Sequence, residues 1–315
     1  MLPDPPVDWS GNAVWGSQPS IDEARSQVFI ATGNVYTAPS EFSDCAESAD
    51  ENSSCLPSDV YQESVMAFDI ATGNINWANQ ISPLDAWTVA CIPGAALPGN
   101  QANCPPAPGP DADFGMAPAF ISASSSDTPD GEDTVVVGQK NGILYALSAT
   151  DGSIFWAIST SPDGTAGGLS WGVAVDTSQI YFTAINYNQL PWKLAPSGRR
   201  IRNSAWGAAS LTDGTVVWDT QVQPNTSQAF NPPTIANDVV ITGRTQFTAT
   251  GAEATKGGEL ILLDSVAGSV VGSMALDVDF HGGIAVKNEY LLFGTGYQNT
   301  FFNTTGSFYV AKISS

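Results

Sequence analysis

The chain has 315 residues, and ten Lys and Arg against 31 Asp and Glu give it a net charge of −21. This charge repels nucleic acid and anionic membrane surfaces, so polyanions are not expected as partners. Thirty Gly, 21 Pro and only 13% charged residues are typical of short β-strands joined by many turns, and no run reaches the roughly 20 apolar residues of a membrane span.

Residues 1–8 lack both the basic and the apolar region of a signal peptide. A strand pattern begins soon afterwards, near Val14, with no preceding segment. We therefore expect this chain to be the later part of a longer protein.

Apolar runs bounded by turn residues predict strands along the whole chain and no helix of useful length. The predicted strands are 26–31, 65–70, 75–79, 118–122, 134–138, 143–148, 153–158, 172–175, 179–184, 205–210, 215–220, 238–242, 259–264, 269–275, 289–293 and 307–313. The Pro-rich interval 81–117 interrupts this series, and we interpret it as a loop insertion.

One sequence motif occurs three times, and a fourth time in weaker form. Each copy is an apolar strand, a turn closed by Gly and a second strand, which ends on Trp in three copies. The copies are 66–77, 145–156, 207–218 and 262–272. Gly provides the positive φ of a short hairpin without steric cost, and Trp offers a wide face for packing between sheets together with an N–H donor.

Repeats that bury no hydrophobic face alone must stack, which predicts an all-β fold, a β-propeller or a related array. The turn glycines at 73, 152, 214 and 268 are 79, 62 and 54 residues apart, which leaves room for one blade in each interval. We predict that residues 1–315 form a single β-propeller domain of about four blades and a partial one.

The four Cys fall into two local pairs, Cys45 with Cys55 and Cys91 with Cys104, and each pair closes a polar loop. Disulfides stabilise such loops and form outside the cytosol. Free or metal-binding thiols are the alternative, but no C-x-x-C spacing and only one His support it. Three N-glycosylation sequons agree with a secreted glycoprotein: Asn52, Asn225 and Asn303.

Four ordered stretches carry a resemblance to a known family. They are the segment 14–22 leading to Ala31-Thr32-Gly33-Asn34, then Asp85-Ala86-Trp87-Thr88, then Gly109-Pro110-Asp111-Ala112-Asp113-Phe114-Gly115, and finally Gly167-Gly168-Leu169-Ser170-Trp171-Gly172. With the repeat, they resemble the pyrroloquinoline-quinone (PQQ) dehydrogenases, and their order resembles the polyvinyl-alcohol-dehydrogenase-like branch. The resemblance covers nearly the whole chain and implies an alcohol-oxidising propeller that uses PQQ and Ca²⁺.

The resemblance also implies roles for individual residues. Asn34 matches an amide that ligates Ca²⁺, and Asp113 matches the carboxylate that serves as general base near the same ion. Lys140 matches the cation that contacts the quinone oxygens, and Trp171 and Gly172 resemble a segment of the cofactor pocket. Alcohol oxidation removes the hydroxyl proton as hydride leaves carbon, so a carboxylate and an activated carbonyl are needed together.

Each assignment has a structural alternative, and the chain also departs from the family. Asn34 is equally consistent with a turn residue, Asp113 with a solvated acid in a loop, and Lys140 with a charged residue at the end of a strand. Quinoprotein dehydrogenases close a propeller of about eight blades, and they supply a further Ca²⁺-binding Glu from an upstream blade that this chain lacks. No Cys-x-x-Cys-His motif for haem attachment is present, so the electron acceptor is expected to be external.

Two other motifs are weaker. The segment 168–172 fits the Gly-x-Ser-x-Gly elbow of hydrolases, with Asp264 or Asp277 and His281 in a suitable order, but a strand rather than a helix is predicted after it. Asp111-x-Asp113 hints at a calcium loop, but Ser122 occupies the twelfth position, which excludes an EF-hand. We interpret the basic run 199–202 as a solvated loop and His281 as a structural residue.

The sequence thus predicts a secreted oxidoreductase that transfers hydride from a primary or secondary alcohol, small or polymeric, to PQQ. Asp113 is the predicted base, and Ca²⁺ would polarise the quinone. The alternatives are a non-catalytic secreted propeller that binds glycan or protein through its aromatic loops, or an inactive fragment of a quinoprotein.

Overall fold

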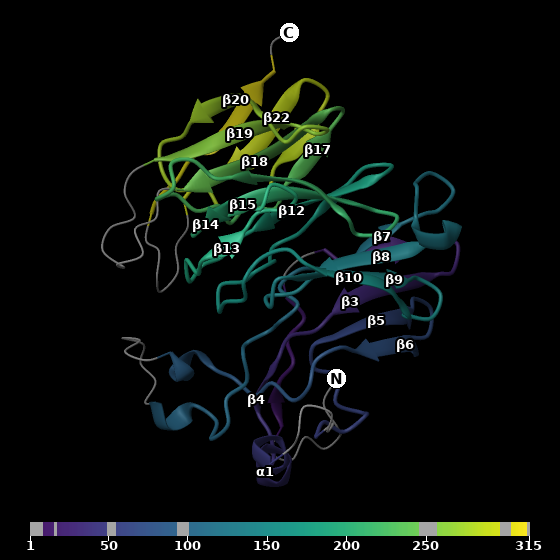
Figure 1. The fold of residues 1–315 in the computed structure, drawn as a ribbon. Helices are drawn as coiled ribbons and strands as arrows, with labels where there is room; N and C mark the ends of the chain where they lie inside the picture. The colour runs from purple at the N-terminus through teal and green to yellow at the C-terminus, as the bar shows by residue number, and fades with distance from the viewer. Residues whose placement is uncertain are drawn as a thin grey trace.

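The computed structural model describes residues 9–15, 18–48, 55–92, 101–245, 257–296 and 304–313. In this part of the chain the main strands pair antiparallel into four four-stranded sheets and one three-stranded sheet. Figure 1 shows these sheets following one another in chain order, from the first sheet with β3, β5 and β6 to the last sheet with β22. The predicted all-β propeller class is confirmed, and the number of blades in the working protein stays a prediction.

The sheets are built from consecutive strands. The first contains β2 (Ser20–Asp22), β3 (Gln27–Ala31), β5 (Ser64–Asp69) and β6 (Ile75–Gln80). The second contains β7 (Ala119–Ile121), β8 (Thr134–Gly138), β9 (Ile143–Ser148) and β10 (Ile154–Ser159). The third contains β11 (Ala174–Val175), β12 (Gln179–Ala184), β15 (Ala205–Ser210) and β16 (Val216–Gln221).

The remaining elements complete the array and decorate its loops. The fourth sheet contains β17 (Thr234–Ala236), β18 (Val239–Thr245), β19 (Gly258–Asp264) and β20 (Val270–Ala275). The fifth contains β21 (Ala285–Lys287), β22 (Tyr290–Gly294) and β23 (Phe308–Lys312). Outside the sheets lie β1 (Ser10–Gly11) with β4 (Val35–Thr37), β13 (Trp192–Lys193) with β14 (Arg200–Ile201), helix α1 (Ser40–Ser48), and the 3-10 turns η1 (Val89–Cys91), η2 (Gln101–Asn103) and η3 (Pro129–Gly131).

The repeated Trp joins each sheet to the next one. Trp77 Nε1 donates to the carbonyl of Ala149 at 3.1 Å, and its ring covers Gly152, where an added Cβ would lie only 2.4 Å from a ring carbon. Trp156 and Trp218 repeat this arrangement one and two sheets further on, with bonds of 3.1 and 2.9 Å. The turn Gly is therefore needed for two reasons, because it adopts a positive φ and because it leaves room for the Trp of the preceding sheet.

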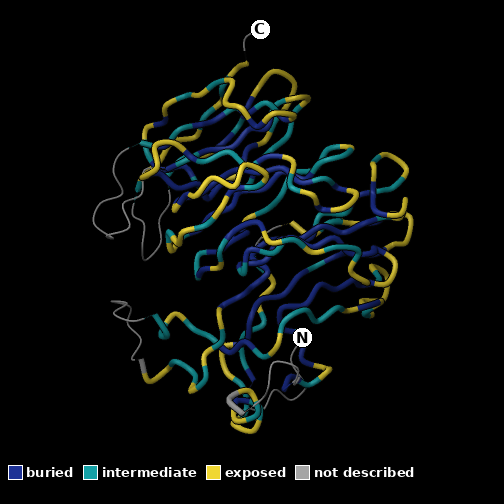
Figure 2. The backbone as a smooth tube through the Cα atoms, in the orientation of Figure 1, coloured by how far each residue is buried: buried dark blue, intermediate teal, exposed yellow. Residues whose placement is uncertain are grey.

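The core lies between the sheets because strand residues alternate between the two faces. Ile180 and Phe182 of β12 pack toward the second sheet, whereas Tyr181 between them packs against Val240 and Leu263 of the fourth sheet. The same alternation joins the fourth and fifth sheets in a separate cluster. Figure 2 shows the result, with buried backbone inside the array and exposed backbone at its turns.

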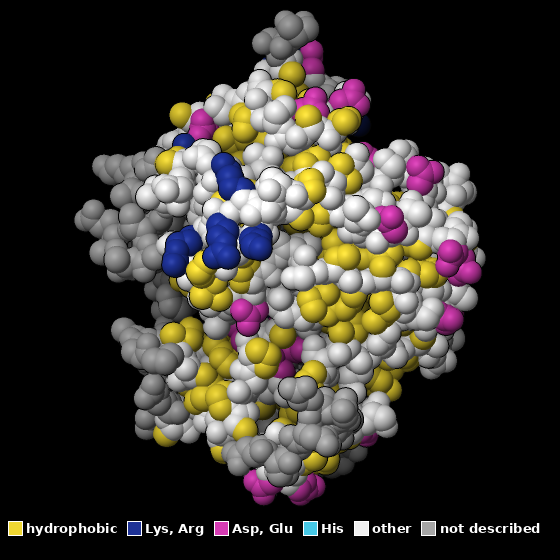
Figure 3. Space-filling model, viewed as in Figure 1, with side chains coloured by type: hydrophobic (Ala, Val, Ile, Leu, Met, Phe, Trp, Pro, Cys, Tyr) yellow, Lys and Arg dark blue, Asp and Glu magenta, His cyan; other side chains and the backbone are white. Residues whose placement is uncertain are grey.

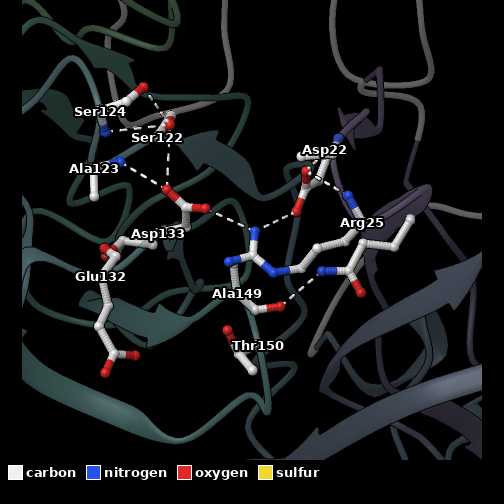
Figure 4. Close-up of polar contacts among 12 residues, drawn as sticks. Asp22, Arg25, Ser122, Ala123, Ser124, Glu132, Asp133, Ala149 and Thr150 are labelled. Carbon is white, nitrogen blue, oxygen red and sulfur yellow. Dashed lines mark hydrogen bonds and ion pairs between the residues drawn. The ribbon is translucent and has the colours of Figure 1, made fainter.

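A polar contact also fixes the first sheet to the second. Arg25 Nη1 lies 2.7 Å from Asp22 Oδ2 and 2.7 Å from Asp133 Oδ2, as Figure 4 shows. Asp133 in turn accepts a hydrogen bond from the backbone N–H of Ala123 at 2.7 Å. The guanidinium thus bridges carboxylates from two sheets, beside the carbonyl of Ala149 that receives the Trp77 bond.

All sixteen predicted strands are present, with ends that differ by at most a few residues. The prediction of no helix was wrong at α1, a nine-residue helix. Phe42 of α1 stacks on Trp9, with ring centroids 5.3 Å apart, and Cys45 in the same helix is bonded to Cys55. These contacts, rather than periodicity, hold a helix too short to be recognised from its pattern.

Both predicted disulfides, Cys45–Cys55 and Cys91–Cys104, are confirmed. Of the three sequons, Asn225 is exposed, whereas Asn52 and Asn303 lie outside the described residues. Within the described residues, no helix has the length and hydrophobicity that a membrane span requires.

Candidate functional site

A cavity of about 850 Å³ opens where loops from successive sheets converge. The predicted insertion lies between β6 and β7 and supplies one wall. The rest comes from the segments next to β1 and β4 and from the connections after β8, β10, β12, β16 and β20. The residues that line the cavity are Trp15, Asn34, Tyr36, Trp87, Thr88, Val89, Cys91, Ile92, Asp111, Asp113, Lys140, Thr165, Ala166, Trp171, Tyr187, Asn188, Phe230 and His281.

Lys140 and Asp113 form the shorter of two buried ion pairs in the site. Lys140 Nζ lies 2.6 Å from Asp113 Oδ2, and the two residues are 6% and 3% exposed. Their backbones are joined as well, because Lys140 N–H donates to the carbonyl of Asp113 at 3.0 Å. Burial alone would lower the pKa of Lys140, but the carboxylates of Asp113 and Asp111 outweigh it and raise that pKa. Lys140 is therefore a fixed positive charge in the cavity wall.

Asp111 is a second carboxylate on the same ammonium group. Its Oδ1 lies 3.1 Å from Lys140 Nζ, while its Oδ2 is buried without a hydrogen-bond partner. Its backbone has a φ of 62°, a left-handed conformation that a non-glycine residue adopts at a cost. Burial raises the pKa of Asp111 to about 8, since the attraction of Lys140 does not fully compensate for it and Asp113 adds repulsion. The site has more buried carboxylate than one Lys can balance.

Asn34 lies next to this group, just before β4. Its backbone N–H donates to Asp113 Oδ1 at 2.8 Å, and its side-chain Nδ2 donates to the carbonyls of Val35 and Trp87, both at 2.8 Å. These bonds fix which way the amide faces and leave Oδ1 as an acceptor on a residue that lines the cavity. Asn34, Asp113 and Lys140, predicted from separate stretches of sequence, are brought together here.

Asp85 supports the segment that carries both carboxylates. Its Oδ2 accepts a hydrogen bond of 2.7 Å from the backbone N–H of Ala112, which stands between Asp111 and Asp113. Beneath it, Glu63 is fully buried, and its pKa is raised well above the usual value by burial and by the neighbouring Asp85 carboxyl. Asp85 thus fixes the backbone between the two cavity carboxylates.

Aromatic rings form the walls around the charged group. Lys140 Nζ lies 4.9 Å from the centroid of the Trp15 ring, a cation–π distance. The rings of Trp15 and Trp171 are 5.9 Å apart and meet at 77°, and Trp171 has a φ of 77° that directs its backbone out of extended geometry. Three Trp side chains, including Trp87, therefore offer flat apolar surfaces beside the carboxylates.

The far wall of the cavity is also aromatic. His281 stacks on Phe230 with ring centroids 5.0 Å apart, and Phe230 lies 6.3 Å from Tyr187. Burial among these groups lowers the pKa of His281 to about 4, so its imidazole is neutral at pH 7. His281 was expected to be structural from the sequence, and the structure places it in the cavity wall.

The structure bears on two further hypotheses from the sequence, the cofactor-pocket role of Gly172 and the hydrolase elbow at Ser170. Gly172 follows Trp171 in the chain but borders a separate, smaller recess with Pro118 and Phe120, so its assignment to a cofactor pocket stays a prediction. Ser170 Oγ has no hydrogen-bond partner, and β11 rather than a helix follows it. A hydrolase elbow needs both a base on the Ser and a following helix, so the geometry of Ser170 does not support the hydrolase interpretation, which was already the weaker one from the sequence.

Sequence reasoning missed several residues of the wall. Asp111 stands inside a stretch that carries the resemblance and was also considered as part of an EF-hand, but it was given no role in the site, although Asp111-x-Asp113 already sets two carboxylates close together. Trp15 and Trp87 stand inside the stretches that carry the resemblance but were given no role. Tyr187 and Phe230 have no local signal, because only the fold brings their loops to the cavity.

Comparison with known proteins shows which family the sequence resembles. The PQQ_2 family model, described as outer membrane protein assembly factor BamB, matches residues 62–269, more than half of the chain. Curated relatives are a polyvinylalcohol dehydrogenase of Pseudomonas sp, 34% identical over 173 residues, and one of Sphingopyxis sp. (strain 113P3), 30% identical over 224 residues. These matches cover 55% and 70% of this chain but only 22% and 29% of the two relatives.

Solved structures share the fold at low identity. The quinohemoprotein alcohol dehydrogenase from Comamonas testosteroni matches 97% of this chain and 50% of its own, with a TM-score of 0.60 and 14% identity. A europium-containing methanol dehydrogenase matches 91% of this chain and 51% of its own, with a TM-score of 0.54 and 14% identity. By its match to the family model, the chain belongs to the PQQ-repeat β-propeller family, and the two curated relatives above are polyvinyl alcohol dehydrogenases.

Proposed function

We propose that this chain carries the cofactor and catalytic site of a PQQ-dependent alcohol dehydrogenase. The observation that carries the proposal is the convergence of Asn34, Asp113 and Lys140 in one aromatic-walled cavity. A general base, a fixed cation and a neutral oxygen ligand are the three kinds of group that alcohol oxidation by a quinone requires.

The cavity fits a flat, acidic quinone. Trp15, Trp87 and Trp171 present apolar ring faces on which a planar aromatic molecule can stack. Lys140 provides a cation for the quinone oxygens, on a side chain that is held in place by two carboxylates. When bound, PQQ supplies an electrophilic carbonyl that accepts hydride from the alcohol carbon.

The same wall fits a hard divalent cation. Among the described residues, no three His, Cys, Asp or Glu side chains form a metal-binding group, so a Ca²⁺ site here depends on the amide oxygen of Asn34 together with carboxylates. Asp111 Oδ2 is the strongest further donor, since it is buried and without a hydrogen-bond partner. Calcium takes amide and carboxylate oxygens of this kind, and we include Asp111 with Asn34 and Asp113 in the ligand set.

Asp113 is the proposed general base. Its carboxylate lines the cavity, and each oxygen already accepts one hydrogen bond, Oδ1 from Asn34 N–H and Oδ2 from Lys140. These two donors fix the orientation of the carboxylate, so that a remaining lone pair can meet the hydroxyl of an alcohol. Asp113 would take the hydroxyl proton while the carbon loses hydride, and the product would be the aldehyde or ketone.

The proposed substrate is a primary or secondary alcohol, either small or part of a polymer. The relatives are dehydrogenases of a polymeric secondary alcohol by name. The far wall of Tyr187, Phe230 and His281 is aromatic and uncharged at pH 7, which suits an aliphatic carbon chain rather than a charged substrate. We also propose that the protein acts outside the cytosol, because its two disulfides persist under oxidising conditions.

Dye reduction tests this proposal. The purified chain would be loaded with PQQ and Ca²⁺, and reduction of an artificial acceptor would be followed with a panel of alcohols. Asp113→Asn should abolish alcohol-dependent reduction, while the exposed Glu132→Gln serves as the matched carboxyl-to-amide control. Full activity in Asp113→Asn would refute the role of the base. A folded parent chain that binds no PQQ would instead favour a propeller that binds glycan or protein without catalysis.

A further inference from the structure

The hairpin of β13 and β14 concentrates positive charge that the proposed site does not use. Its segment 192–202, here named the basic hairpin, carries four of the ten Lys and Arg of the chain. All four side chains are exposed: Lys193, Arg199, Arg200 and Arg202. Figure 3 shows Lys and Arg side chains gathered on one part of the face, where Figure 1 places β13 and β14.

These charges are not neutralised within the described part of the molecule. The ion pairs found there involve Arg25, Lys140, Arg244 and Lys312, and none involves the basic hairpin. Only Arg199 has a polar side-chain contact, from its Nη2 to Gln221 Oε1 at 2.8 Å. In a protein with 31 acidic residues, four clustered cations without a carboxylate keep their full local field, which attracts an anionic partner.

The basic hairpin is held rigidly. Leu194 and Ile201 belong to the hydrophobic core and are 2% and 6% exposed. The backbone N–H of Ala195 donates to Asp219 Oδ2 of β16 at 2.8 Å, and Trp192 Nε1 donates to the carbonyl of Asn203 at 3.1 Å. The basic side chains therefore project from a fixed frame, which lowers the entropic cost of binding.

The basic hairpin is also tied directly to the cavity wall. Asn186 is fully buried, and its Nδ2 donates to the carbonyls of Leu190 and Arg202 at 2.9 and 2.8 Å. The two residues that follow it, Tyr187 and Asn188, line the cavity. A partner bound to the basic hairpin would thus rest beside the mouth of the proposed site.

We propose that the basic hairpin is the docking surface for an acidic protein that accepts electrons from the reduced cofactor. This inference rests on the proposed function, because alcohol oxidation leaves two electrons in the site, and they must pass to an acceptor before the next turnover. Two encounters with a one-electron acceptor would remove both electrons and release two protons to solvent. A compact acidic partner fits best, since an extended polyanion or an anionic membrane would also meet the surrounding negative surface of this −21 protein.

The test uses one acceptor protein in two charge states. Cytochrome c is basic, and succinylation of its lysines makes the same haem protein acidic. Binding of each form to the parent chain would be measured without alcohol or PQQ, and electron transfer would be measured separately with the loaded enzyme. The variant Arg200→Glu/Arg202→Glu is compared with Lys287→Glu/Lys312→Glu, which makes the same charge change on the exposed fifth sheet.

We expect the parent chain to bind succinylated cytochrome c more tightly than the unmodified, basic cytochrome c. Arg200→Glu/Arg202→Glu should weaken this binding, and slow electron transfer to the succinylated form, by at least about tenfold at low ionic strength. The difference should shrink at high salt, and the control variant should change by less than about twofold. Rates with a neutral dye are measured in parallel, so that a general loss of turnover is divided out.

Equal binding by the parent and Arg200→Glu/Arg202→Glu would overturn the proposal, as would a preference for the basic form. Equal loss in both double variants would also overturn it, because net charge rather than the basic hairpin would then be responsible. Failure of the proposed function has a different signature: no dye is reduced by any form of the chain, while the binding measurement still decides whether the hairpin captures an acidic protein.

Discussion

Lys140 Nζ lies 2.6 Å from Asp113 Oδ2 and 3.1 Å from Asp111 Oδ1, so one buried ammonium group holds two carboxylates. Asp113 is the proposed base, and Asp111 is the additional ligand in the proposed calcium site. The proposed chemistry of the cavity depends on keeping these three groups together.

Replacement of the base should affect turnover more than binding. Asp113→Asn keeps the acceptor oxygen near Lys140 and Asn34 but removes the proton acceptor, so kcat with an alcohol should fall by about 10²- to 10⁴-fold. Steady-state kinetics with PQQ and Ca²⁺ in excess would measure this loss. Unchanged kcat in Asp113→Asn, with Glu132→Gln as control, would assign the proton to another group.

Asp111 is expected to determine the affinity for calcium. Asp111→Asn removes a carboxylate from a ligand set that otherwise has one carboxylate and one amide, so Ca²⁺ affinity should fall by at least about tenfold. Calorimetric titration of the PQQ-free chain with Ca²⁺ alone measures the effect without any catalysis. If Asp111→Asn and Glu132→Gln bind Ca²⁺ as the parent does, Asp111 is not a ligand.

The turn glycines offer a matched pair for testing how the sheets are joined. Gly73 and Gly152 have φ values of 73° and 75°, but an added Cβ meets nothing within 4 Å at Gly73 and lies 2.4 Å from the Trp77 ring at Gly152. Both Ala variants lose the conformational freedom of Gly, and only Gly152→Ala displaces the Trp. Chemical denaturation should show an extra loss of about 1–3 kcal/mol for Gly152→Ala. Equal losses would mean that Trp packing contributes nothing measurable.

The pH dependence of stability should contain a contribution from Asp219. Burial raises its pKa to about 7 from the usual 3.8, although it accepts a hydrogen bond from Ala195 N–H. Between these values the unfolded state has released a proton that the folded state keeps, so the free energy of unfolding falls as pH rises from about 4 to 7.

Asp219→Asn removes this titration and retains an acceptor for Ala195. Relative to the parent, the variant should therefore be more stable at pH 8 than it is at pH 5. Denaturation curves at the two pH values measure the difference. A parent and a variant with parallel pH profiles would show that Asp219 is ionised at no cost in the folded protein.

Much of the fold could be predicted because the repeat encodes it locally. Gly152 and Trp156 sit at fixed positions in their copy, and the alternation of Ile180, Tyr181 and Phe182 assigns each side chain to one of two core layers. Short strands such as β13 and β14 were missed, since two residues show no alternation. The run 199–202, interpreted as a solvated loop, is partly strand and is fixed by the buried Ile201.

The site was only partly predictable for a different reason. Asn34, Asp113 and Lys140 were placed by resemblance, and their proximity follows from the fold. Asp111 could not be distinguished from a solvated acid, because its burial depends on Lys140, 29 residues further along the chain. His281 reaches the cavity from the start of the fifth sheet, far from every other group of the site in sequence.

The most direct test of the proposed cofactor site is a titration of the purified chain with PQQ in the presence and absence of Ca²⁺, followed by tryptophan fluorescence. Trp15, Trp87 and Trp171 line the cavity, so binding there should quench emission. If PQQ and Ca²⁺ bind in this cavity, quenching should be saturable and Ca²⁺-dependent, and it should be lost in Asn34→Ala and in Asp113→Ala. A folded chain whose fluorescence does not respond to PQQ, or responds equally without Ca²⁺ and in both variants, would contradict it.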